Sequence, residues 1–128
     1  PDEYIIKGDF LFDTGFRFAE TILSLKPTPT AVVTGNDEMA LGLIKGLKLL
    51  GKEVPDDISV VGFDDIENSH QFHPALTTIH VPHERVAKLA VENLLHLIDN
   101  KATNEKSTLT HVTVVPVHLV ERESCKRL

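Results

Sequence analysis

Residues 30–65 alternate a short apolar run, an amphipathic stretch and a second short apolar run. This pattern predicts a β-strand, a helix and a second strand parallel to the first. The first run ends in Asn36-Asp37 and the second in Asp64-Asp65. Carboxyl ends of parallel strands meet at one edge of a sheet, where open α/β sheets bind their ligands. We therefore expect these four polar residues at one rim of a binding site.

Strand and helix patterns alternate along the remaining sequence. This alternation predicts an α/β fold, with a mainly parallel sheet flanked by helices. Asp13 or Thr14 is expected to cap the first helix, and Gly51 to end the second in the left-handed conformation. We expect the tail from Glu121 to fray. The predicted elements are an extended entry at 4–6, helices at 13–26, 37–50 and 82–99, a helix or loop at 66–73, and extended runs at 76–81 and 111–120.

Composition restricts the class of protein. The 128 residues, 41% of them hydrophobic, are enough for one domain core. No apolar run approaches the roughly 20 residues that span a bilayer, so we expect no membrane partner. Cys125 is the single cysteine, which suits a reducing, cytoplasmic location. The net charge of −6 would repel phosphate backbones, so this chain by itself is not expected to bind nucleic acid.

The chemistry of the predicted rim favours hydrogen bonding over catalysis. The sequence has no phosphate-binding loop, nucleophile elbow or HExxH motif. Asp64 and Asp65 are adjacent, so their carboxylates should diverge and not form a catalytic or magnesium-binding pair. One ionised carboxylate, at Asp64, can accept from two hydroxyl groups of a sugar or nucleoside. We assign helix capping to Asp37 and leave Asn36 for the ligand, although the two roles could be exchanged.

Seven histidines raise the alternative of a metal site. Two pairs have the spacing His-x-x-His, at 70–73 and 80–83. Zinc would need further cysteine or histidine ligands, and Cys125 is remote in sequence. Surface histidines are the simpler explanation, and we expect neither a metal nor a cofactor.

The helix predicted at 37–50 has one clear apolar face, and Leu41 lies outside it. Its neighbours on that other side are Lys45 and Lys48. A surface that binds a partner and a single exposed leucine are equally compatible with this pattern.

Several stretches together resemble the effector-binding domain of the lactose repressor/galactose repressor (LacI/GalR) family of bacterial transcription regulators. They run in family order and cover nearly the whole chain. The matching stretches are Gly8-Asp9-Phe10, Thr34 to Gly42, Val54 to Asp65, Pro74 to Ile79 and Leu119 to Ser124.

The resemblance implies a periplasmic-binding-protein-like fold (type I), of which this chain would be the C-terminal lobe, with effector in the cleft between two lobes. Matched residues would place Phe10 as a wall of the effector site, Asn36 and Asp64 as polar contacts, and His83 facing the cleft. The resemblance also implies a homodimer. Its surface would include Leu41, Lys45, Asn68 and Phe72.

The resemblance also implies which parts of a regulator are absent. The family's helix-turn-helix and hinge have no counterpart here, so DNA would be bound only through an absent N-terminal domain. We expect 1–79 plus 116–124 to form the lobe, 80–115 to belong to the missing N-terminal lobe, and 125–128 to be a tail. The helix from Pro82 has an apolar stripe that would be costly to expose, so we expect it to pack on missing protein or on another copy. This chain would then be the carboxyl-terminal third of a repressor.

Three functions compete at this point. The first is the effector-binding and dimerisation portion of a regulator that responds to a sugar, a related polyol or a nucleoside. The alternative is the sugar-binding protein of an ABC-type transporter, which shares the fold. A receiver-like or enzymatic α/β domain is the third, and it predicts dependence on magnesium or turnover.

Overall fold

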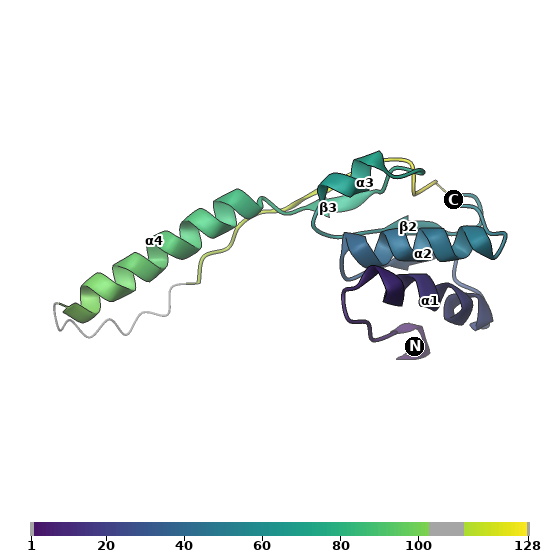
Figure 1. Ribbon diagram of the computed structural model, residues 1–128, viewed down its shortest axis with the longest axis horizontal. Helices are drawn as coiled ribbons and strands as arrows, with labels where there is room; N and C mark the ends of the chain where they lie inside the picture. Colours follow the sequence, from purple (N-terminus) through teal and green to yellow (C-terminus); the bar gives the residue numbers. More distant parts are fainter. Residues whose placement is uncertain (1, 103–111, 128) are drawn as a thin grey trace. The chain divides into compact units, whose positions relative to one another are not determined.

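The computed structural model describes residues 2–102 and 112–127, and these residues divide into two compact units. The first unit comprises Pro1–His80 and His118–Leu128, and the second comprises Val81–Val117. The elements of the first unit are η1 (Asp2–Tyr4), α1 (Phe12–Ser24), β1 (Ala31–Val33), α2 (Asp37–Leu49), β2 (Ser59–Val61), α3 (Glu67–Gln71), β3 (Thr78–His80) and β4 (His118–Val120), in the order coloured in Figure 1.

The predicted strand, helix and parallel strand are confirmed as β1, α2 and β2. Val32 pairs with Val60 in parallel register. Isolated parallel bridges extend the pairing from β2 towards β3, and β4 pairs antiparallel with β3. The described residues thus form two two-stranded sheets, β1-β2 and β3-β4, and the isolated parallel bridges link one to the other. Gly51 ends the helix region with φ +74°, as predicted.

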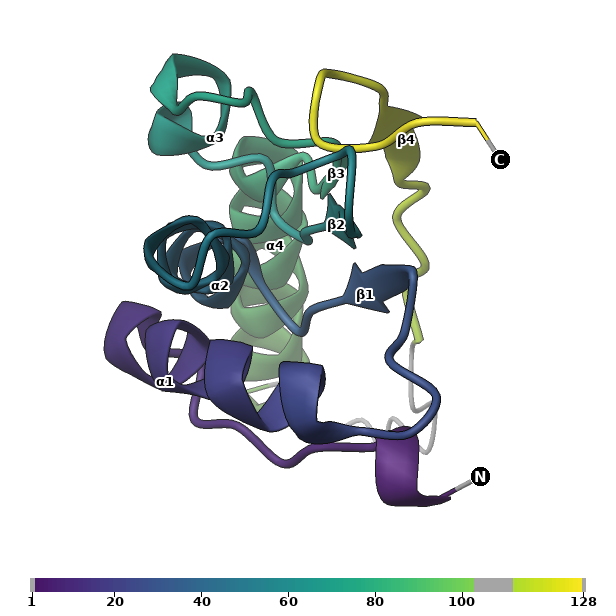
Figure 2. The same cartoon turned by 90° about the vertical axis from the view of Figure 1, so that its right-hand side faces the viewer.

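Helices α1 and α2 lie side by side on the same face of the β1–β2 pair (Figure 2). Their backbones approach so closely that an added Cβ at Gly42 or Gly46 would overlap backbone atoms of α1. Glycine is therefore required at this helix contact. The core fills the space between helices and strands, and its fully buried side chains include Leu43, Ile44, Leu47, Val60 and Leu76.

Three details differ from the prediction. The cap of α1 is Leu11, without a side-chain bond, so the assignment of this role to Asp13 or Thr14 is wrong. The entry predicted at 4–6 as extended or as a strand end is wrong at Tyr4, which ends η1, a 3-10 helix, while residues 5–6 belong to no helix or strand. The segment after Glu121 does not fray, because Ser124 is fully buried and its carbonyl accepts from the Val60 amide at 2.9 Å.

The second unit contains α4 (His83–Ala102), a helix of 20 residues that confirms the predicted helix from Pro82 and extends it. Its apolar side chains are exposed: Leu94 by 57% and Ile98 by 54%. Part of the extended run predicted at 111–120 is β4, and His111 lies outside the described residues. Among residues 2–102 and 112–127, no helix has the length and apolar character of a transmembrane span.

Candidate functional site

The polar residues after β1 and β2 lie side by side at the carboxyl ends of these strands. The Asp37 amide donates to the Phe63 carbonyl at 2.9 Å, which joins the segment after β1 to the segment after β2. Asn36 and Asp64 immediately flank this bond. The structure therefore brings the two predicted contact residues to one edge of the sheet, and we call this edge the rim.

Phe10 reaches the rim from the loop before α1. Its carbonyl oxygen accepts from Asn36 Nδ2 at 2.9 Å, and its ring lies against Gly35, where an added Cβ would come within 3.0 Å. Phe10 has φ +65° and is 62% exposed. An exposed aromatic ring in the left-handed backbone region is unusual, and here it presents an apolar surface beside polar groups.

Asn36 is the N-cap of α2, the role that the sequence analysis assigns to Asp37. Its Oδ1 accepts from the Met39 amide at 3.0 Å. Both polar atoms of the amide therefore make local bonds, and one N–H and one lone pair remain for a ligand. The assignment of capping to Asp37 is wrong.

Asp37 is instead a fully buried carboxylate beneath the rim. Its Oδ1 accepts from the Thr78 hydroxyl, and its Oδ2 accepts from the Ile66 amide at 2.9 Å. Burial raises the pKa of Asp37 above its usual value, and the nearby charges of Asp64 and Asp65 act in the same direction, against these two hydrogen bonds. The side chain holds α2, the segment before α3 and β3 together.

Asp64 and Asp65 are adjacent but have different polar contacts. Both have positive φ, of 113° and 59°. The half-buried Asp64 carboxylate makes no hydrogen bond or ion pair with the described residues, whereas its amide donates to the Ile79 carbonyl at 2.9 Å. A carboxylate without a protein partner at the end of a strand is free to accept hydrogen bonds from a ligand.

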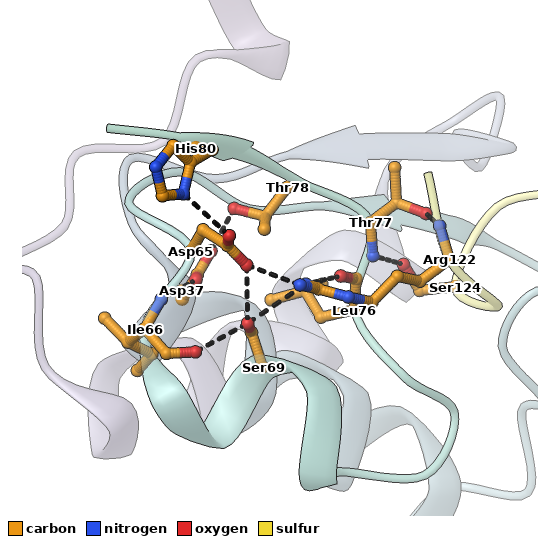
Figure 3. Close-up of polar contacts among 10 residues, drawn as sticks. All are labelled: Asp37, Asp65, Ile66, Ser69, Leu76, Thr77, Thr78, His80, Arg122 and Ser124. Atoms are coloured by element: carbon orange, nitrogen blue, oxygen red, sulfur yellow. Dashed lines mark hydrogen bonds and ion pairs between the residues drawn. The ribbon is translucent and has the colours of Figure 1, made fainter. Parts of the chain in front are cut away.

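The Asp65 side chain makes polar contacts with three residues, as Figure 3 shows. Its Oδ1 accepts from Arg122 Nη2 at 2.6 Å and from the Ser69 hydroxyl at 3.2 Å, and its Oδ2 contacts His80 Nδ1 at 2.9 Å. We call these four residues the Asp65 cluster. Burial alone would raise the pKa of Asp65, but the bonds from Arg122 and His80 outweigh it, so the pKa lies below its usual value.

The sequence reasoning missed the Asp65 cluster. It considered His80 only as a surface histidine or a zinc ligand, and it assigned no role to Arg122. The available signal was the charged run Glu121-Arg122-Glu123, which directly follows the last strand, β4. The described residues contain no group of three or more His, Cys, Asp or Glu side chains that could hold a metal ion.

His83 is the first residue of α4 and belongs to the second unit. Its side chain is exposed. Its assignment to the effector site stays a prediction.

The residues assigned to a dimer surface have different environments. Leu41 is only 3% exposed and packs in the core, so the expectation that it faces outward is wrong. Lys45 is exposed, with its Nζ 5.6 Å from the centre of the Phe12 ring, and Asn68 is exposed as well. Phe72 is half-buried against the core. Lys45 and Asn68 can therefore contact a partner without disturbing the core.

An apolar cavity of about 310 Å³ lies between η1, α1 and β1. It is lined mainly by aliphatic and aromatic side chains, among them Phe18, Ile22 and Leu43. Neither Asn36 nor Asp64 lines it. This cavity lacks the charged groups that a polyhydroxylated ligand needs, so the rim remains the candidate site.

Known proteins match this chain over most of its length. Residues 4–125 match the family described as the periplasmic binding protein-like domain. The HTH-type transcriptional repressor PurR of Photorhabdus laumondii is 44% identical over 123 residues, which cover 96% of this chain and 35% of that repressor. The chain thus spans about a third of the length of the curated relatives it matches.

Two solved structures show the same fold. A LacI family transcriptional regulator from Enterococcus faecalis with bound ribose superposes with a TM-score of 0.83 at 29% identity, covering 96% of this chain and 43% of that one. The lac repressor dimer bound to operator and the anti-inducer ONPF gives a TM-score of 0.77 at 33% identity, covering 92% and 39%. Sequence and structure agree, and the chain belongs to the family of periplasmic binding protein-like domains, in its LacI/GalR branch.

Proposed function

We propose that this chain is the effector-binding and dimerisation portion of a DNA-binding transcriptional regulator. The observation that carries the proposal is the half-buried Asp64 carboxylate, which has no partner among the described residues and follows β2 at the edge where Asn36 follows β1. DNA would be bound by another part of the full-length protein. Support comes from the relatives, which are named as helix-turn-helix repressors, and from the operator-bound lac repressor.

The effector we propose is a sugar or a related polyol or nucleoside. Asp64 accepts from two hydroxyl groups, Asn36 adds one donor and one acceptor, and the Phe10 ring covers an apolar face of the molecule. The E. faecalis neighbour with bound ribose supports this class. We infer binding and not catalysis, because Asp65 is already engaged with Arg122 and His80 and cannot act together with Asp64.

The division of the chain suggests how binding would be used. We propose that 80–115 belong with the N-terminal lobe of the full-length protein, that the effector lies between the lobes, and that two copies associate through the surface around Lys45 and Asn68. Effector binding would then change the relative orientation of the two lobes of the full-length protein and so change its DNA affinity. A cytoplasmic location follows from a function on DNA.

A thermal-shift screen of the full-length protein tests this proposal. The panel is D-ribose, D-glucose, D-galactose, adenosine and ribose 5-phosphate. We expect at least one compound to raise Tm, and Asp64→Ala to remove that shift while leaving operator affinity unchanged. Asp57→Ala is the matched control. Asp57 also carries a carboxylate, but it lies outside the rim and pairs with Lys52, with 3.2 Å between Oδ1 and Nζ. Equal Tm shifts in the Asp64→Ala variant and the wild type would refute the site.

A further inference from the structure

The turn that carries Asp64 has a backbone conformation that needs external support. Two consecutive residues without the freedom of glycine, Asp64 and Asp65, both have positive φ. Such a conformation persists only where the surrounding contacts impose it. The described contacts are the Asp64 amide bond to Ile79 and the side-chain bonds of Asp65.

The Asp65 cluster anchors this turn firmly. The Asp65 side chain is only 15% exposed and that of Arg122 only 17%. Arg122 also donates from Nη1 to the Leu76 carbonyl at 2.8 Å and to the Ser69 hydroxyl at 3.1 Å. The guanidinium therefore joins the turn to α3 and to the segment before β3, as the dashed lines in Figure 3 show.

The same cluster reaches the two strands that connect the units. His80 is the last residue of β3, and the second unit begins at the next residue; His118 is the first residue of β4, where the chain returns. These two histidines are paired in register, with ring centroids 4.9 Å apart and planes inclined by 41°. The contact between Asp65 and His80 thus joins the turn that carries Asp64 to both connecting strands, to β3 directly and to β4 through its pairing with β3.

We propose that Asp65 is a positioning residue that couples the Asp64 rim to β3 and β4, the strands through which the chain passes between its units. Asp65 does not touch the effector. It sets the direction of the Asp64 carboxylate and transmits a change at the rim to His80 and from there to His118. This inference rests on the proposed function for its biological use.

The electrostatics of the cluster support this role. Asp65 has a lowered pKa, so it stays ionised at neutral pH, and charge-assisted bonds to a guanidinium are shorter and stronger than neutral ones. The bond of 2.6 Å to Arg122 is short even for this class. Besides the Asp64 amide bond to Ile79, the side-chain contact with His80 gives displacement of the turn a route to the connecting strands.

Hydrogen exchange of the full-length protein without ligand tests the coupling. In the Asp65→Ala variant at pH 7, we expect at least fivefold faster exchange in three peptides, 61–67, 78–83 and 117–121. Exchange in β1 and α2 should stay as in the wild type, since general destabilisation would accelerate every element. The control Asp57→Ala should change exchange only near 52–58, because Asp57 bonds Lys52 and the Glu53 amide.

The His80→Ala variant tests the contact between Asp65 and His80 separately from the bond between Asp65 and Arg122. It leaves in place the bond between Asp65 and Arg122 and the Asp64 amide bond to Ile79, and it removes the side-chain contact of Asp65 with β3. We expect faster exchange at 117–121 and at 61–67. Three results would each overturn the proposal. They are faster hydrogen exchange in Asp65→Ala confined to 61–67, equally faster exchange in all elements of that variant, and unchanged exchange at 61–67 in His80→Ala.

Calorimetry with D-ribose and adenosine adds a binding measurement. We expect Asp64→Ala to abolish binding, Asp65→Ala to weaken it at least tenfold, and Asp57→Ala to leave it unchanged. Wild-type affinity in Asp65→Ala would overturn the positioning role. Wild-type affinity in Asp64→Ala, or no binding by the wild type, would count against the proposed function alone, because the exchange comparison uses no ligand.

Discussion

Replacing Asp37 by alanine and by asparagine separates two contributions of a buried carboxylate. Alanine removes the acceptor for two groups, the Thr78 hydroxyl and the Ile66 amide. Each unsatisfied buried donor lowers the free energy of unfolding by about 1–3 kcal/mol, and removal of the buried charge offsets part of this loss. We expect Asp37→Ala to lower the free energy of unfolding by about 3 kcal/mol.

Asparagine can keep both hydrogen bonds. Its Oδ1 can accept from the Ile66 amide while its Nδ2 donates to the Thr78 hydroxyl, which then acts as acceptor. The substitution also removes the cost of desolvating a charge. At neutral pH we expect Asp37→Asn to be within about 1 kcal/mol of the wild type.

The pH dependence gives the sharper comparison. Because the pKa of Asp37 is raised in the folded state, its favourable contribution is complete below its usual value of 3.8 and is lost as pH rises through the raised pKa. Asparagine does not titrate. The stability of Asp37→Asn relative to the wild type should therefore increase as pH rises through this range and then level off.

Urea unfolding of the full-length protein measures both the loss of hydrogen bonds and the pH dependence. Circular dichroism monitors the unfolding at one protein concentration, between pH 4 and 7.5. A difference between Asp37→Asn and wild type that does not change with pH would refute the assignment of a raised pKa. Equal destabilisation by asparagine and alanine would refute the proposed exchange of hydrogen bonds.

Three further predictions concern packing and assembly. Gly42→Ala should destabilise the protein by about 2–4 kcal/mol in urea unfolding, because the new methyl group would overlap the backbone of α1 and the helices must separate. Leu94→Ser on α4 should lower the free energy of unfolding of the full-length protein by about 2 kcal/mol if the other lobe buries this exposed side chain. The control Glu92→Ser on the same helix should change it by less than about 0.5 kcal/mol. Equal effects of the two substitutions would contradict the proposed lobe contact. The combined substitutions Lys45→Glu and Asn68→Arg should convert the proposed dimer to monomer in sedimentation velocity, and an unchanged dimer would exclude this surface.

The strand, helix and parallel strand could be predicted from the sequence because each depends on local periodicity. Apolar runs of a few residues and a helical stripe between them are sufficient to identify β1, α2 and β2. The position of Asn36 and Asp64 at one edge follows from the parallel direction of the strands, and not from any long-range information.

The errors arose where a side chain interacts with a distant segment. The burial of Leu41 depends on how other segments of the core pack on α2, and periodicity within one helix does not contain that information. The choice between Asn36 and Asp37 as cap was decided by Thr78, which is 41 residues away from Asp37. The Asp65 cluster depends on Arg122, which is 57 residues from its partner.

Ser124 has a consequence for the order of events during synthesis on the ribosome. Its hydroxyl donates to the Val60 carbonyl, 64 residues earlier, and accepts from the Thr77 amide. The sheet of the first unit therefore stays incomplete until the whole second unit has been translated, and closing so long a loop carries an entropic cost. During that interval β2 and the segment before β3 expose unpaired backbone groups, which makes the nascent chain a substrate for chaperones and vulnerable to aggregation.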